Sequence, residues 1–229
     1  LHSDTHSFPT RRSSDLVQIL KSVRWILERL PEPAEFLREA EARTLPDLFG
    51  GFRHRFATGR EVASLLIGAR ELVLRHGSLN AAFRTYHEPD AATVVPALTG
   101  FVEELTSAAR EPLGHLVARP ERGSACKRLH LMLRWLVRRD EVDPGGWEGV
   151  RPAQLVIPLD VHMDRICRLL GLTRRKQASL VTALEVTEGF RRICPEDPVR
   201  YDFVLTRLGI RGEMDAEAFA RRHGLGFSG

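Results

Sequence analysis

The sequence has 229 residues, of which 43% are hydrophobic and 28% charged, a composition typical of a soluble globular protein with one or two domains. Its 34 Lys and Arg against 30 Asp and Glu give a formal net charge of +4 at pH 7. No apolar run approaches the roughly 20 residues of a membrane-spanning helix, and three scattered cysteines predict neither a disulfide framework nor a metal-ligand cluster.

Residues 1–16 are expected to be an artefact, because the stretch from Asp4 to Leu16 resembles the translation of a common sequencing-adapter oligonucleotide. This stretch lacks the apolar core of a secretory signal. We therefore expect authentic protein to begin near Val17, with the natural N-terminus missing.

Residues 17–118 are expected to form an incomplete N-terminal helical lobe. Apolar side chains from Leu20 to Leu30 recur at helical spacing, and the pattern stops at Pro31. Gly77-Ser78 provides a helix stop followed by a new cap. The same spacing predicts further helices at 33–40, 59–76, 78–86 and 90–109.

A second helical lobe is expected over residues 119–211, because prolines and glycines interrupt the pattern at 110–123. The run from Leu155 to Leu159 is the one serious strand candidate, and its proline argues against a central strand. We expect an all-α fold and a C-terminal tail at 212–229. Four helices are predicted in the second lobe. The first spans 124–138, and the second runs from Asp160 to Gly171. The third begins at Arg174 after a Thr173 cap, and the fourth begins at Asp197-Pro198.

Positive charge is concentrated in the second lobe. Residues 119–211 hold 18 Lys/Arg against 12 Asp/Glu, whereas residues 17–118 hold 12 against 13. This asymmetry favours contact of the second half with a polyanion. The alternative is a solvated surface of arginines.

Lys127 and Asp160 are the candidate catalytic residues. A lysine nucleophile and a carboxylate are the groups that can displace a damaged base from DNA and hold the sugar covalently. Lys127 lies in the first turn of its predicted helix, where the helix dipole disfavours a cation. The alternatives are a surface lysine for Lys127 and a helix N-cap for Asp160, worth about 1 kcal/mol.

Other polar and aromatic residues are assigned structural roles. The histidines lack the spacing of a metal site, and a buried structural thiol is favoured for Cys126. Trp135 and Tyr201 could stack on a base, although core packing is favoured for both. Asp197 and Asp202 are interpreted as caps and surface partners.

Four segments resemble DUF2400, a family of bacterial proteins of unknown function, and the resemblance runs from about Val17 to Ile210. Members normally begin with several more helices, which agrees with the expected loss of the N-terminus. The segments are Gly-Ser-Ala-Cys-Lys-Arg-Leu at 123–129, Leu-Arg-Trp-Leu-Val-Arg at 133–138, Ile-Pro-Leu-Asp-Val-His at 157–162 and Pro-Glu-Asp-Pro-Val-Arg-Tyr-Asp-Phe at 195–203.

The segment Pro158-Leu159-Asp160-Val161-His162-Met163 also resembles the corresponding segment of helix-hairpin-helix 8-oxoguanine DNA glycosylases. Residues 123–128 occupy the position of their hairpin and catalytic lysine. This resemblance implies that Lys127 attacks the sugar, that Asp160 stabilises positive charge on it, and that His162 lies near a DNA phosphate. The usual Gly-x-Gly hairpin is reduced to Gly123, and the 33-residue interval between Lys127 and Asp160 resembles the archaeal-type branch.

The resemblance implies a two-lobed glycosylase-type helical bundle that excises an oxidised purine, 8-oxoguanine-like, and acts as an AP lyase through a lysine Schiff base. The expected partner is double-stranded DNA with a damaged base, bound by a cytoplasmic monomer without metal or cofactor. The alternative is a non-catalytic helical nucleic-acid-binding protein. The residues expected to bind DNA are Gly123, Arg128, His162, Arg174, Arg175 and Lys176.

Overall fold

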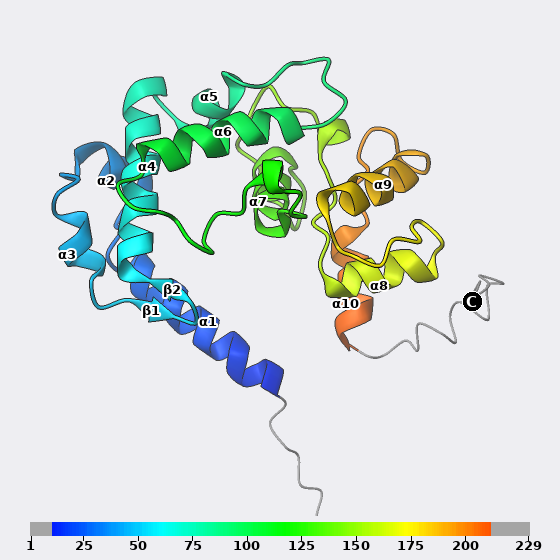
Figure 1. Ribbon diagram of the computed structural model, residues 1–229, viewed down its shortest axis with the longest axis horizontal. Coiled ribbons are helices and arrows are strands. Elements are labelled where there is room, and N and C mark those ends of the chain that lie inside the picture. The colour runs from blue at the N-terminus through cyan, green and yellow to red at the C-terminus, as the bar shows by residue number, and fades with distance from the viewer. Residues whose placement is uncertain (1–10, 212–229) are drawn as a thin grey trace, which may run out of the picture. The chain divides into compact units, whose positions relative to one another are not determined.

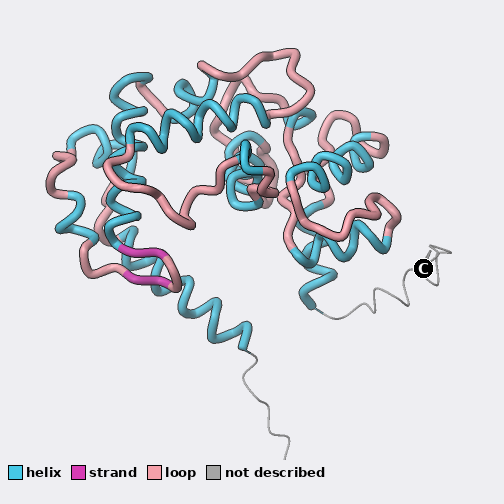
Figure 2. The backbone as a smooth tube through the Cα atoms, in the orientation of Figure 1, coloured by secondary structure: helices cyan, strands magenta, loops and turns pink. Residues whose placement is uncertain are grey.

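The computed structural model describes residues 11–211, and the prediction of an all-α fold is confirmed because this part of the chain is mostly helical (Figure 1). The tail at 212–229 and residues 1–10 of the adapter-like segment lie outside the described residues. Over residues 11–211, no helix is both long and apolar enough to span a membrane. The only sheet described there is a two-stranded hairpin, magenta in Figure 2.

The chain folds as two compact units. Unit 1 contains the chain through Gly77 together with Leu105–Leu116, and unit 2 contains Ser78–Glu104 and the chain from Val117 onward. This grouping assigns residues 78–104 to the second unit, whereas the sequence interpretation placed a single boundary near residue 118.

Unit 1 is built around α4, Gly59–His76. Thr58 caps this helix, because its hydroxyl accepts from the Glu61 amide and the Glu61 carboxylate accepts from the Thr58 amide. Gly77 ends the helix in the left-handed region at φ 86°. The other elements are α1 (Arg11–Leu27), α2 (Pro33–Glu39), α3 (Leu45–Phe49), β1 (Arg53–His54) and β2 (Ala57–Thr58).

Apolar side chains of α3 and α4 form the core of unit 1. Trp25 of α1 packs against this core, and its ring centroid lies 5.4 Å from that of Phe52. Burial of this face explains why these short segments hold together. The buried members are Leu30, Leu45, Phe49, Phe52, Val62, Ala63 and Ile67.

Unit 2 contains the helices of the predicted second lobe and α5 (Leu79–Arg84). Ser78 caps α5 as predicted, by accepting from the Ala81 amide. Helix α6 (Val95–Ala108) begins in this unit, and α8 packs against α10 (Figure 1). The remaining elements are the 3-10 turn η1 (Pro120–Arg122), α7 (Lys127–Val137), η2 (Pro152–Gln154), α8 (Val161–Leu169), α9 (Leu180–Arg191) and α10 (Asp202–Arg211).

The helix predicted to begin at Arg174 is wrong, because residues between α8 and α9 form a loop (Figure 2). Helix α9 begins at Leu180, where the Ser179 hydroxyl accepts from the Thr182 amide. Three successive cations at 174–176 would be unfavourable at the positive end of a helix dipole, whereas Ser179 is a preferred N-cap.

One further element prediction is wrong. The last helix begins at Asp202 rather than at Asp197-Pro198. The Asp197 carboxylate accepts from Arg138 Nε at 2.9 Å, and this long-range pair takes the place of a cap. The run at 155–159 is not a strand, in agreement with the argument from its proline. It is a buried, non-helical segment that leads into α8, and its Ile157 amide donates to Thr187 Oγ1 at 3.0 Å.

Candidate functional site

Lys127 is the first residue of α7, and a tight turn places it there. Gly123 follows η1 with φ 74°, and its amide donates to the Pro120 carbonyl at 2.9 Å. The Gly123 carbonyl accepts from the Leu180 amide at 2.9 Å. Cys126, at φ 45°, precedes the helix without a side-chain cap. Both backbone groups of Gly123 are thus engaged within unit 2.

Asp160 precedes α8 and caps it. Its Oδ1 accepts from the amides of His162 and Met163 at 2.9 and 2.8 Å. The side chain is 14% exposed and is held rigidly by these two bonds. The cap interpretation of Asp160 is therefore confirmed, and it leaves the second carboxylate oxygen for another partner.

Lys127 Nζ donates to that second oxygen, Asp160 Oδ2, at 2.9 Å. The Lys127 side chain remains 45% exposed. Burial raises the pKa of Asp160, but hydrogen bonds from the Met163 amide and the Lys127 ammonium, together with the lysine charge, hold that pKa below its usual value. The two residues predicted from separate segments of the sequence thus form one ion pair.

This ion pair borders a pocket of about 220 Å³ in unit 2. Typical pockets for drug-sized ligands enclose roughly 300–1,000 Å³, so this one suits a smaller group. Trp135 was expected in the core, but it is 46% exposed and lines the pocket. The lining residues are Lys127, Leu131, Arg134, Trp135, Val142, Pro158, Asp160, Asp202, Phe203 and Thr206.

A buried ion pair forms part of the pocket lining. Arg134 Nη1 donates to Asp202 Oδ2 at 2.6 Å, and their side chains are 3% and 6% exposed. Burial is the largest influence on the Asp202 carboxyl and raises its pKa, which Arg134 and Thr206 lower and the negative charge of Asp160 raises further. The interpretation of Asp202 as a cap or surface partner is therefore wrong.

Arg134 of α7 and Arg138, the residue that follows this helix, extend this pair into a network. Arg134 Nη2 lies 3.1 Å from Asp143 Oδ2, and Arg138 contacts the same carboxylate. Arg138 also binds Asp140 at 2.7 Å and Asp197 at 2.9 Å. A buried network of ion pairs of this kind fixes the side chains in place.

His130 lies between Lys127 and Arg134 on α7 and is 1% exposed. Over the described part of the chain, neither of its ring nitrogens has a hydrogen-bond partner. Burial lowers its pKa to about 4. The side chain is therefore a neutral histidine held in the core, and among the described residues no group of three or more His, Cys, Asp or Glu is arranged to hold a metal ion.

The predicted DNA-binding side chains lie outside the pocket lining. Arg174, Arg175 and Lys176 are exposed on the loop between α8 and α9, and Arg128 is exposed on α7. His162 is half-buried in the first turn of α8. The structure therefore brings Lys127 and Asp160 together, and the other predicted residues lie in the same unit.

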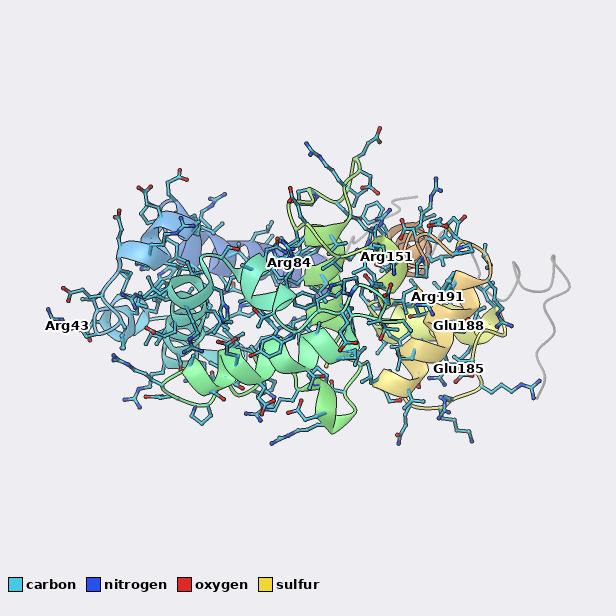
Figure 3. The ribbon with its side chains drawn as sticks, turned by 90° about the horizontal axis from the view of Figure 1, so that it is seen from above. Arg43, Arg84, Arg151, Glu185, Glu188 and Arg191 are labelled. Carbon is cyan, nitrogen blue, oxygen red and sulfur yellow. The ribbon has the colours of Figure 1, made fainter. Side chains whose placement is uncertain are left out.

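The basic loop at 174–176 is anchored at both sides. Arg168 of α8 donates to the Lys176 carbonyl at 3.2 Å. Arg175 pairs with Glu185 of α9 at 2.7 Å, and Figure 3 shows Glu185 and Glu188 on the same helix. Arg174 lines a second opening in this unit, of about 550 Å³, together with other residues of the loop after α8 and with Glu185 and Glu188 of α9.

Sequence reasoning missed Arg134, Trp135 and Asp202 as pocket residues. Trp135 and Asp202 lay within the recognised segments 133–138 and 195–203, so the signal was present but was assigned to packing and capping. Arg134 lies in the same segment 133–138, but nothing in the sequence pointed to a partner 68 residues away.

Comparison with known proteins identifies a family for the chain. No curated protein and no solved structure is significantly similar to the chain. A family model described as "Protein of unknown function (DUF2400)" matches residues 15–211, which include both α7 and α8. The chain therefore belongs to the DUF2400 family.

Proposed function

We propose that this protein is a DNA glycosylase with AP lyase activity that excises an oxidised purine, 8-oxoguanine-like, through a Schiff base on Lys127. The observation that carries the proposal is the 2.9 Å pair of Lys127 Nζ and Asp160 Oδ2 beside a pocket. An amine nucleophile, a carboxylate that can take its proton and a space for the displaced group are the parts that this reaction needs.

The first step is proton transfer from Lys127 Nζ to Asp160 Oδ2, along their hydrogen bond. The neutral amine attacks the sugar C1′, and the C1′–N9 electron pair leaves with the purine. A proton passes from the newly formed secondary ammonium to the departing base. Transfer of the Asp160 proton to O4′ then opens the sugar ring, so that Asp160 is again a carboxylate and Lys127 carries an iminium. The Asp160 carboxylate then takes a proton from C2′, the C2′–H electron pair forms a C2′=C3′ double bond, and the 3′ phosphate leaves with the C3′–O electron pair, which nicks the strand.

Asp160 suits this role because one carboxylate oxygen keeps the group fixed while the other faces Lys127. The two amide bonds to Oδ1 hold the carboxylate at the start of α8 while Oδ2 exchanges a proton. A preorganised carboxylate also stabilises positive charge that develops on the sugar as the glycosidic bond breaks.

The pocket would receive the extrahelical base. Flipping a nucleotide out of the duplex costs a few kcal/mol, and stacking on aromatic and apolar side chains offsets this. Leu131, Trp135 and Phe203 line the pocket and offer such surfaces. Its volume of about 220 Å³ suits a single flat heterocycle better than a larger ligand.

Double-stranded DNA would be held by contacts around the pocket. In this proposal Arg128, Arg174, Arg175 and Lys176 bind phosphates without sequence preference, and His162 lies near a phosphate. The turn at Gly123, between η1 and α7, would serve as the hairpin of a glycosylase-type bundle. Because both backbone groups of Gly123 are engaged internally, its part would be to allow the turn. The protein would act as a cytoplasmic monomer.

The second candidate is a non-catalytic helical protein that binds nucleic acid. The observation that favours it is the cap at Asp160, since capping α8 and pairing with a half-exposed lysine would account for both residues without any chemistry. Binding to undamaged and damaged duplexes alike, without strand cleavage, would support this candidate.

Strand cleavage of a duplex containing 8-oxoguanine, before and after alkali, tests the proposal. The sequence contains only three lysines, Lys21, Lys127 and Lys176, so each can be replaced by alanine in turn. We expect Lys127→Ala to lose base excision and nicking, while Lys176→Ala keeps both and binds DNA more weakly. Equal activity of all three variants would refute the assignment of Lys127.

A further inference from the structure

The hairpin of β1 and β2 in unit 1 presents a large aromatic side chain to solvent. Its strands pair His54 with Ala57, so only Arg55 and Phe56 form the turn. A tight hairpin turn of this length uses a left-handed first residue, and Arg55 has φ 53°. Phe56 is 80% exposed, and its ring centroid lies 5.8 Å from that of His115. The ring therefore adds little to the core of unit 1 and is available to a partner.

The same hairpin is strongly basic. Residues 53–60 contain three arginines, one histidine and no acidic residue. Arg53, Arg55 and Arg60 are all exposed. Residues 17–118 as a whole hold 12 Lys/Arg against 13 Asp/Glu, so this segment is a local concentration of positive charge. A single exposed apolar residue is ordinary on a protein surface, but one surrounded by cations favours an anionic partner with apolar groups inside it.

A small opening beside the hairpin adds a second cationic feature. It encloses about 180 Å³ between α1 and the start of β1, and its cations are Lys21 and Arg53. The hydroxyl of Ser22 and Nδ1 of His54 lie 2.8 Å apart, and this contact holds the hairpin beside α1 (Figure 1). Two cations next to the polar side chains of Gln18 and Ser22 suit a phosphate group. The other lining residues are Trp25, Gly51 and Phe52.

We infer that this hairpin is a DNA-contacting wedge, in which Phe56 inserts between stacked base pairs of a duplex while Lys21 and Arg53 bind a backbone phosphate. Apolar side chains inserted between base steps partly unstack them and kink the duplex. One aromatic side chain is enough for a wedge, whereas a platform for single strands stacks successive bases on several, and membrane anchoring needs a larger apolar area. The inference rests on the proposed function for its partner, duplex DNA, but not for the chemistry at Lys127.

The test uses duplexes that carry a tetrahydrofuran analogue of the abasic site. This analogue cannot form a Schiff base, so binding is measured without the chemistry. The fluorescent base 2-aminopurine, which brightens when it is unstacked, is placed at successive positions along the duplex. The main variant is Phe56→Ala, and its matched control is Leu74→Ala, because Leu74 is an apolar residue of α4 in the same unit and is 50% exposed.

We expect the unmodified protein to brighten 2-aminopurine over a short stretch of the duplex. Phe56→Ala should lose this signal and bind the duplex about 5- to 100-fold more weakly, whereas Leu74→Ala should keep both. The Tm of Phe56→Ala should be unchanged, because the side chain is 80% exposed. Arg53→Ala should keep the fluorescence signal and reduce the slope of log K against log salt by about 0.9.

Two results would overturn the inference. One is equal duplex binding and equal fluorescence for Phe56→Ala and the unmodified protein. The other is binding to vesicles containing phosphatidylserine that depends on Phe56, combined with duplex binding that does not.

Cleavage of a natural abasic site, measured in parallel, separates the inference from the proposed function. Cleavage that depends on Lys127, without any effect of Phe56→Ala on the duplex, would remove the inference and keep the proposed function. Unstacking that depends on Phe56, without cleavage, would keep the inference and remove the proposed chemistry.

Discussion

Asp160 has a structural and a proposed chemical role, and two substitutions separate them. Asparagine is as good an N-cap as aspartate, so Asp160→Asn keeps an oxygen for the amides of His162 and Met163 but removes the charge that pairs with Lys127. Asp160→Ala removes both. Comparing the two variants therefore separates the effect of losing the helix cap from the effect of losing the ion pair with Lys127.

The structure sets the expected magnitudes. Loss of the cap costs about 1 kcal/mol, with a range of about 0.5–2 kcal/mol. The ion pair adds about 0–1 kcal/mol, because Lys127 is 45% exposed and solvent screens the interaction. For a chain of this length each kcal/mol shifts Tm by roughly 2–4 °C. We expect Asp160→Ala to lose roughly 2–8 °C and Asp160→Asn at most a few degrees.

Thermal unfolding followed by far-UV circular dichroism measures the structural part, and abasic-site cleavage measures the chemical part. Ser179→Ala serves as the control, because Ser179 caps α9 in the same way but does not line the pocket. We expect both Asp160 variants to lose cleavage and Ser179→Ala to retain it. Full cleavage by Asp160→Asn would refute the proton-transfer role. An equal loss of Tm in both Asp160 variants would refute the claim that the cap contributes more to stability than the ion pair does.

Three further substitutions test other parts of the account. The pKa of His130 is about 4 in the folded protein against an ordinary 6.5. As the pH falls, His130 therefore gains a proton in the unfolded chain before it does so in the folded protein. About 3 kcal/mol of the free energy of unfolding should be lost between about pH 6.5 and 4. In urea unfolding at a series of pH values His130→Leu should remove that slope, and an unchanged slope would contradict the assignment. Arg174→Ala should weaken duplex binding and reduce the slope of log K against log salt by about 0.9, whereas Arg43→Ala in unit 1 should not; equal slopes would argue against a phosphate contact. Trp135→Ala should reduce excision of a damaged base more than abasic-site cleavage, because only the first needs stacking, and an equal loss in both assays would exclude a stacking role.

Local signals in the sequence were enough to predict several helix boundaries. Ser78 and Asp160 cap α5 and α8 as expected, because a side chain that bonds amides two or three residues ahead depends only on neighbouring residues. The same local reasoning was wrong at Thr173 and Asp197. Thr173 Oγ1 does accept from the Arg175 amide at 3.1 Å, but the turn does not continue into a helix.

The candidate site was only partly predictable. Family-like segments identified Lys127 and Asp160, and the structure joins them across 33 residues. The pair of Arg134 and Asp202 spans 68 residues and depends on how α10 packs against the rest of unit 2. Neither periodicity nor capping rules carry information on such a contact, so Asp202 could not be distinguished from a surface carboxylate.

Identification of the trapped residue is the most direct test of the central claim. The protein would be incubated with an abasic-site duplex and borohydride, which reduces the Schiff base to a stable amine. The trapped complex would then be digested, and the modified peptide would be identified by mass spectrometry. The account predicts a single adduct on Lys127, with Lys21 and Lys176 unmodified. An adduct on another amine, or none from folded protein that binds the duplex, would contradict the Schiff-base mechanism.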